Sequence, residues 1–166
     1  MRVFNRLSNL AVVASITLGS LIAGTGSAAA VPLNACDGKS YATLVANYHR
    51  GGSLYGLRCG NTSFGFVHLK PRWNATFDSY IALTISRGED VNDVEQDGGS
   101  VIFALFDDRC NELFRVVYNG GAYNGNGIRP QGIITAYYRT TGGPAHASRA
   151  GAAPQYRTDC PVIQGV

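Results

Sequence analysis

The chain has 166 residues, of which 14 are Lys or Arg, 11 are Asp or Glu and 45% are hydrophobic. This composition is typical of a globular protein and argues against an intrinsically disordered chain or a repeat array. The formal net charge of +3 is too small to indicate a strongly basic nucleic-acid-binding or membrane-surface protein.

The first 30 residues have the features of a secretory signal peptide. Arg2 and Arg6 precede an uncharged apolar run from Leu10 to Ile22, and small residues ending at Ala30 supply an A-x-A cleavage site. We expect residues 31–166 to form one secreted, extracellular domain, because the remaining length suffices for a single hydrophobic core. Removing the two arginines lowers the net charge to +1. No apolar run of membrane-spanning length remains, so the mature form is expected to bind no membrane.

Four cysteines follow the signal, at positions Cys36, Cys59, Cys110 and Cys160. An exported chain meets an oxidising compartment, where two disulfides are the expected outcome. Of the three pairings available, we favour Cys36–Cys160, which ties the two ends together, with Cys59–Cys110 inside it. A zinc site is disfavoured, since the closely spaced Cys and His clusters of structural zinc sites are missing.

Two helices are predicted in the first half. From Ser40 to His49, apolar residues recur at helical spacing, and Gly51-Gly52 would end that helix. A glycine-rich loop should follow, leading into a short extended piece around Phe64 to Val67. The clearest helix then begins at a cap, Asn74 or Thr76, and ends at Gly88. One of its faces is apolar, formed by Phe77, Tyr80, Ile81, Thr84 and Ile85.

Three strands are predicted in the second half, at Val101–Phe106, Leu113–Tyr118 and Ile133–Tyr138, the first two forming a hairpin around Asp107–Asn111. The glycine-rich connector Asn119–Gly132 reads as a long surface loop. The tail, residues 139–166, is expected to be coil pinned by Cys160. This order predicts a disulfide-stabilised α+β domain in which N-terminal helices precede a small antiparallel sheet.

Histidine is rare, with only His49, His68 and His146, so chemistry that needs an imidazole has few candidates. His68 lies in an aromatic segment beside Lys70 and Arg72, two cations that could hold an anion. The alternative is a histidine that only makes a structural hydrogen bond. His49 follows the first predicted helix, where it could be a favourable charge at a helix C-terminus or an acid and base in catalysis.

Several segments between Tyr55 and Tyr137 point to a family. They are Tyr55-Gly56-Leu57-Arg58, the Gly-aromatic-x-His segment in Ser63–Leu69, the helix after Trp73, the strand Phe114–Val117 and the closing run Gly132–Tyr137. In their order and separation these segments resemble the barnase, EndoU, colicin and RelE group of ribonucleases. The chain looks most like the bacterial toxin-domain and EndoU-type branches.

The resemblance implies cleavage of RNA, without a metal or other cofactor, by attack of the 2′-hydroxyl on phosphorus. His68 matches the motif histidine and would be the general base or acid, while Thr135 and Tyr137 match strand positions that contact phosphate or base. His49 could be the second imidazole of an EndoU-type pair. Proximity in sequence to these motifs adds Lys70, Arg72 and Arg115 as candidate substrate-binding cations. A cognate inhibitor or immunity protein is an implied partner besides RNA.

Two other functions fit the same residues. A secreted binding module or inhibitor could use the loop Asn119–Gly132, with Tyr118 and Tyr123 as aromatic anchors. The second alternative is a structural extracellular protein that is stabilised by its disulfides and has no catalytic histidine. In that case Thr135 and Tyr137 simply alternate with Ile134 and Ala136, as in any half-buried strand.

Overall fold

The computed structural model describes residues 30–91, 99–123, 127–139 and 156–160. The predicted signal peptide, apart from Ala30, lies outside the described residues, as do His146 and most of the predicted tail. In chain order the elements are β1 (Leu44–Arg50), β2 (Ser53–Arg58), α1 (Gly65–Leu69), a 3₁₀ turn (Lys70–Arg72), α2 (Ala75–Arg87), β3 (Glu89–Asp90), β4 (Ser100–Phe106), β5 (Glu112–Asn119) and β6 (Gly132–Tyr138).

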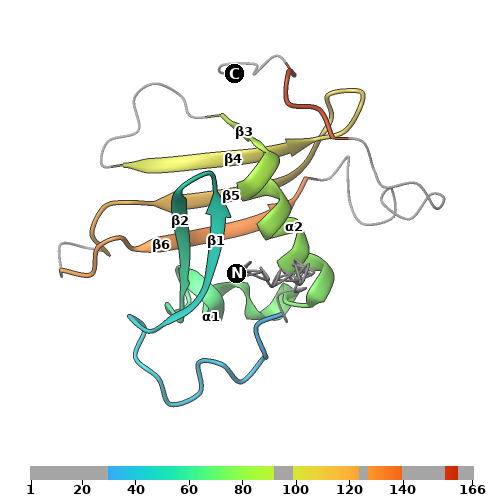
Figure 1. Ribbon diagram of the computed structural model, residues 1–166. Coiled ribbons are helices and arrows are strands. Elements are labelled where there is room, and N and C mark those ends of the chain that lie inside the picture. Colours follow the sequence, from blue (N-terminus) through green and yellow to red (C-terminus); the bar gives the residue numbers. More distant parts are fainter. Residues whose placement is uncertain (1–29, 92–98, 124–126, 140–155, 161–166) are drawn as a thin grey trace, which may run out of the picture.

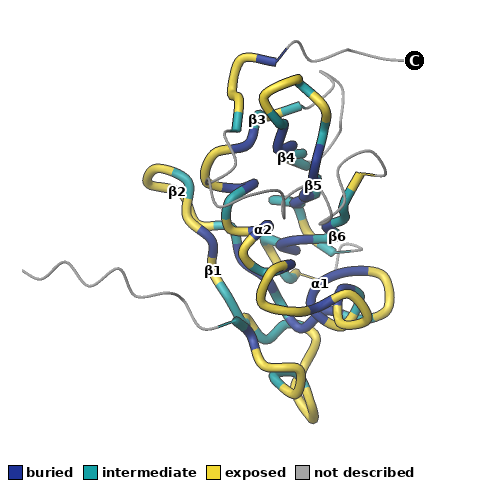
Figure 2. The backbone as a smooth tube through the Cα atoms, turned by 90° about the vertical axis from the view of Figure 1, so that its right-hand side faces the viewer, coloured by how far each residue is buried: buried dark blue, intermediate teal, exposed yellow. Residues whose placement is uncertain are grey.

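The strands form two antiparallel sheets. β1 and β2 make a hairpin, and the larger sheet has the strand order β3-β4-β5-β6. The hairpin and α2 lie together on one side of the larger sheet (Figure 1). Most of the core lies between these layers and is rich in aromatic rings, among them Phe66, Trp73, Phe77, Phe103 and Phe114. Figure 2 shows buried residues in the middle of the larger sheet and an exposed tip of the hairpin.

The prediction of a helix from Ser40 to His49 was wrong, because this segment contains β1. Tyr48 is buried while its neighbours Asn47 and His49 are exposed, which is the alternation of a strand with one covered face. β1 turns into β2 at Gly51-Gly52, and Arg50 pairs with Ser53 across this two-residue loop. Gly51 has a φ of +55°, which suits a hairpin turn.

The predicted order of elements was therefore also wrong. The chain combines helices with strands and carries two disulfides, yet a β-hairpin precedes both helices. The short extended piece expected at Phe64 to Val67 was wrong as well, since Gly65–Leu69 is the helix α1. Gly65 has a φ of +76°, and a Cβ there would lie only 2.6 Å from the Arg58 carbonyl oxygen. This close approach lets α1 pack tightly against the end of β2.

The second predicted helix and the three predicted strands were correct. The Asn74 side chain accepts a hydrogen bond from the Phe77 amide at 2.9 Å and caps α2, and Gly88 follows the last helical residue. β4 and β5 form the expected hairpin, closed by a hydrogen bond from the Asp107 amide to the Asn111 carbonyl. Local capping and turn residues were sufficient to identify these elements.

All four cysteines form disulfides, but the favoured pairing was wrong. The bonds join Cys36 to Cys59 and Cys110 to Cys160. Cys59 follows β2, and its amide donates to the Thr43 carbonyl at the open end of the hairpin, next to the N-terminal turns that carry Cys36. Cys110 lies in the turn between β4 and β5. Each bond thus ties one end of the chain to a neighbouring turn.

Candidate functional site on the outer face of β5 and β6

One face of the larger sheet is packed against α2. Phe114 on β5 and Tyr138 on β6 both contact Phe77 of α2, with ring centroids 5.2 and 5.8 Å apart. Successive side chains of a strand point to opposite faces, so the neighbouring residues Arg115 and Tyr137 point away from α2. We call this second face of β4, β5 and β6 the outer face.

The register of β5 and β6 gathers three of the predicted site residues on the outer face. Arg115 lies opposite Tyr137, and Val117 lies opposite Thr135. Residues that are directly opposite in an antiparallel pair share a face. Arg115, Thr135 and Tyr137 are all half-buried, so each retains some contact with solvent.

Glu112 holds the Arg115 guanidinium in a fixed position. Arg115 Nε and Nη2 donate to the two carboxylate oxygens of Glu112 at 2.7 and 2.8 Å, a bidentate geometry. Arg139 Nε lies 3.4 Å from the same carboxylate, whose side chain is only 13% exposed. The hydrogen bonds to Glu112 raise the pKa of Arg115, and the nearby Tyr137 hydroxyl raises it further. Two guanidinium groups and one carboxylate leave this patch with a positive charge.

A β-bulge explains why Glu112 and Arg115 share a face although they are three positions apart. Phe106 of β4 pairs with Glu112 and Leu105 with Phe114, so Leu113 is an extra residue on β5. An extra residue shifts the alternation of a strand by one position. Glu112 is thereby moved from the face of Phe114 to the outer face.

A second bulge directs Thr135 outward. Val117 pairs with Thr135 and Tyr118 with Ile133, so Ile134 is the extra residue on β6. Ile133 is fully buried in the core, whereas Thr135 two positions later points to the outer face. The closing run therefore supplies both core and outer-face side chains over a short distance.

His68 lies at the β6 edge of the same sheet. It is the fourth residue of α1, and α1 lies beside β6 in both views (Figures 1 and 2). His68 Nδ1 is 2.8 Å from the Thr62 carbonyl oxygen. A carbonyl only accepts hydrogen bonds, so this contact requires a hydrogen on Nδ1. The contact thus leaves Nε2 as the ring nitrogen available for proton transfer.

Lys70 and Arg72 follow His68 in the 3₁₀ turn, and both are exposed. Lys70 Nζ lies 3.6 Å from the Asp37 carboxylate in a solvent-exposed ion pair. Such pairs are weak and exchange readily with other partners. Both cations thus lie in the turn that directly follows the helix of His68.

The structure does not bring His49 to His68. His49 lies opposite Leu54, next to the hairpin tip, whereas α1 adjoins the opposite, open end of the hairpin through the Val67 amide and the Cys59 carbonyl. Five residues of strand between the levels of Leu44 and His49 correspond to about 17 Å. The structure therefore places His49 and α1, the helix of His68, toward opposite ends of the hairpin.

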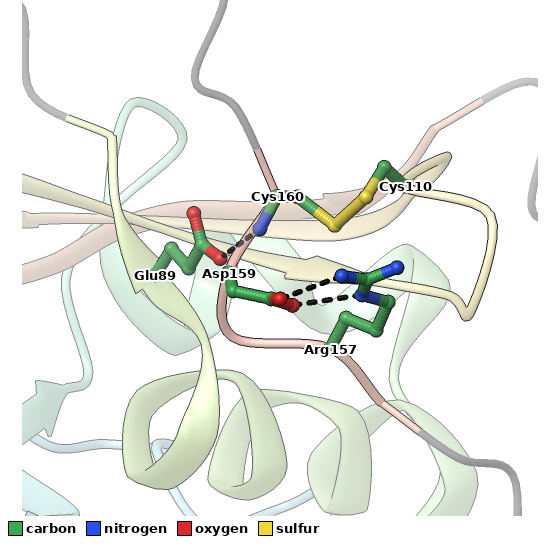
Figure 3. Close-up of polar contacts among 5 residues, drawn as sticks. All are labelled: Glu89, Cys110, Arg157, Asp159 and Cys160. Carbon is green, nitrogen blue, oxygen red and sulfur yellow. Dashed lines mark hydrogen bonds and ion pairs between the residues drawn. A yellow bond between two sulfur atoms is a disulfide. The ribbon is translucent and has the colours of Figure 1, made fainter.

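The C-terminal segment, residues 156–160, contacts the larger sheet at β3 and β4. Cys160 packs with Ala104 and Phe106 of β4, and its amide donates to Glu89 Oε1 at 2.8 Å. Figure 3 shows the disulfide that attaches this segment to Cys110. Over β3 and β4 the outer face is thus occupied, which confines the candidate site to β5 and β6.

Two residues of this site were missed from the sequence, Glu112 and Arg139. Arg139 follows the predicted strand Ile133–Tyr138 directly, so its charge at a strand end was a readable signal. Glu112 offered no such signal, because its place on the outer face depends on the bulge at Leu113.

Comparisons with known proteins found no matching family model, no matching curated protein and no matching solved structure. Among the described residues, no three His, Cys, Asp or Glu side chains are grouped as a metal site would require. No helix in the described ranges has the length and hydropathy needed to cross a membrane.

Proposed function

We propose that this protein is a secreted endoribonuclease that cleaves RNA without a metal ion. The observation that carries the proposal is the joint placement of Arg115, Thr135 and Tyr137 on the outer face of β5 and β6. The resemblance of the closing strand and of the His68 segment to metal-independent ribonucleases supports the same function. A positively charged patch with two hydroxyl groups suits an RNA phosphate.

The proposed reaction needs one base and one acid. The base takes the proton of a ribose 2′-hydroxyl, whose oxygen then attacks the adjacent phosphorus. The bond from phosphorus to the 5′-oxygen breaks, the acid returns a proton to that oxygen, and a 2′,3′-cyclic phosphate remains. His68 Nε2 serves as one of these two groups. Arg115 stabilises the charge that develops on the phosphoryl oxygens, while Thr135 and Tyr137 supply hydroxyl donors.

Secretion is part of the proposal. Two disulfides, with no free cysteine among the described residues, support folding in an oxidising compartment. A cognate inhibitor or immunity protein remains a proposed partner, since a ribonuclease endangers the RNA of the cell that makes it.

The alternative of a binding module with free aromatic anchors receives less support. Tyr118 is buried and packs edge-on against Tyr55, with ring centroids 4.9 Å apart. Tyr123 packs on Phe64 at 4.6 Å. Of the two proposed anchors of the loop Asn119–Gly132, Tyr118 is therefore buried, and Tyr123 is covered in part by Phe64.

A cleavage assay tests the proposal. The purified, oxidised chain is incubated with mixed-sequence RNA in excess chelator, beside the variants His68→Ala and His49→Ala. We expect cleavage by the unmodified chain and by His49→Ala, and at least a hundredfold slower cleavage by His68→Ala, about the contribution of one acid or base. Cleavage that stops in chelator, or that continues unchanged in His68→Ala, would contradict the proposal.

A further inference from the structure

The loop Asn119–Gly132 brings Tyr123 onto the turn that precedes α1. The Tyr123 ring lies 4.6 Å from the Phe64 ring, with 36° between their planes. The centroid of the Tyr41 ring lies 6.1 Å from that of the Tyr123 ring, with 61° between their planes. A residue from a late loop therefore joins an aromatic cluster with residues from the first part of the described chain.

This turn also carries the candidate catalytic histidine. Asn61 Nδ2 donates to the Tyr123 hydroxyl at 3.0 Å, and the carbonyl of the next residue, Thr62, contacts His68 Nδ1 at 2.8 Å. The Asn61 side chain is itself fixed, because its Oδ1 accepts from the Ser63 amide at 2.8 Å. Tyr123 and His68 are thus held by consecutive residues of one turn.

The burial of the cluster leaves part of Tyr123 accessible to solvent. Phe64 is completely buried, whereas Tyr123 is half-exposed. The Phe64 and Tyr41 rings both lie against the Tyr123 ring, so its exposed surface is the part that these two rings leave uncovered. The contact with Phe64 and the hydrogen bond from Asn61 to the hydroxyl hold the Tyr123 ring in place before a ligand binds.

We propose that Tyr123 is the platform on which an unpaired base of the RNA substrate stacks, next to the nucleotide that His68 acts on. The inference rests on the proposed ribonuclease function and specifies its substrate as single-stranded RNA. Single-stranded nucleic acids are commonly held by bases that stack on aromatic side chains, and a fixed ring needs no ordering when the base binds. A base inside a duplex cannot reach such a ring.

Binding of a substrate that cannot be cleaved tests this inference. The probe is a single-stranded 2′-fluoro oligonucleotide with one 2-aminopurine base, which lacks the 2′-hydroxyl nucleophile. Stacking on Tyr123 is expected to quench the 2-aminopurine fluorescence. Tyr123→Leu should lose the quenching and bind roughly tenfold more weakly, a typical effect of losing one stacked base. Tyr123→Phe keeps the ring and should retain the quenching.

Tyr156→Leu is the matched control, because Tyr156 is also half-exposed but interacts with Tyr80 of α2. This variant should bind and quench as the unmodified chain does. NMR of the unmodified chain tests the same contact without relying on the folding of a variant. Adding the probe should shift the resonances of the Tyr123 ring and leave those of Tyr156 in place.

The outcomes separate this inference from the proposed function. Cleavage of RNA without quenching and without a Tyr123 shift would overturn the stacking inference alone. Quenching and a Tyr123 shift without cleavage would overturn the ribonuclease function and leave Tyr123 as a nucleic-acid contact. Equal quenching in folded Tyr123→Leu would also overturn the inference, as would a duplex probe that binds as tightly as the single strand.

Discussion

Glu112 and Arg115 are three positions apart in β5, and their side chains nevertheless meet in a bidentate ion pair with N–O distances of 2.7 and 2.8 Å. In a regular strand, residues three apart point to opposite faces. The bulge at Leu113 brings both to the outer face, where Tyr137 lies opposite Arg115. The guanidinium is therefore oriented before substrate binds, which favours stabilisation of a transition state.

Replacing Arg115 tests its part in the reaction. Arg115→Ala is expected to lower kcat/KM for RNA cleavage by about 10²–10³-fold, the usual effect of removing one fixed donor to a developing charge. Initial rates on a fluorescent oligoribonucleotide measure it. Arg109→Ala, at an exposed position in the β4–β5 turn, is the matched control and should keep its rate. Equal rates for the two variants would exclude Arg115 from the site.

The contact between β1 and α2 should be a source of stability and not of activity. The hydroxyl of buried Tyr48 donates to Asp78 Oδ1 at 2.6 Å, and burial together with this carboxylate raises the pKa of Tyr48. Tyr48→Phe is expected to lower the free energy of unfolding by about 1–3 kcal/mol, because the carboxylate loses its partner. Urea unfolding measures this, with Asp78→Asn as the milder comparison, since an amide oxygen still accepts. An unchanged denaturation midpoint for Tyr48→Phe would show that the bond contributes nothing.

The two disulfides should differ in their effect on stability. Cys36–Cys59 closes a loop with a sequence separation of 23, and Cys110–Cys160 one of 50. Loop-closure entropy predicts losses of about 3 and about 4 kcal/mol when each is replaced by a pair of alanines. Digestion without reduction, followed by mass spectrometry, checks the pairing itself. A peptide joining Cys36 to Cys160 would contradict the structure.

The turn between β4 and β5 should make part of the stability depend on pH. Burial alone would raise the pKa of Asp107, but hydrogen bonds from Asn111 and Arg109 outweigh it and lower that pKa below its usual value. The stability from this carboxylate is thus complete above about pH 4, the unfolded-state value, and is lost as pH falls through the lower folded-state value. Thermal unfolding should show Asp107→Asn less stable than the unmodified chain at pH 7, with the gap closing below pH 4. A gap that is constant down to pH 2 would refute this.

The sequence predicted those elements whose signals are local. Asn74 and Gly88 mark the two ends of α2, and the apolar runs of β4, β5 and β6 are bounded by turn residues. These features depend on neighbours within a few positions, which the sequence displays directly.

The elements that were missed depend on contacts distant in the chain or on backbone irregularities. The apolar spacing of Leu44, Val45 and Tyr48 fits one turn of a helix. The segment is a strand because it pairs with β2. The Gly51-Gly52 pair was a hairpin signal that could have been read in this way. Arg115, Thr135 and Tyr137 could be named from the sequence, but their common face follows from the register of β5 and β6 and from the bulge at Ile134.

The measurement that tests the central claim most directly uses a DNA oligonucleotide with a single ribonucleotide. The oxidised chain is incubated with it in excess chelator, and the product ends are analysed by mass spectrometry. We predict one cut, on the 3′ side of the ribonucleotide, leaving a 2′,3′-cyclic phosphate and a 5′-hydroxyl, and no cut when that nucleotide carries 2′-fluorine. Cleavage of the 2′-fluoro oligonucleotide, or intact oligonucleotide after incubation with folded protein that binds it, would contradict the assigned reaction.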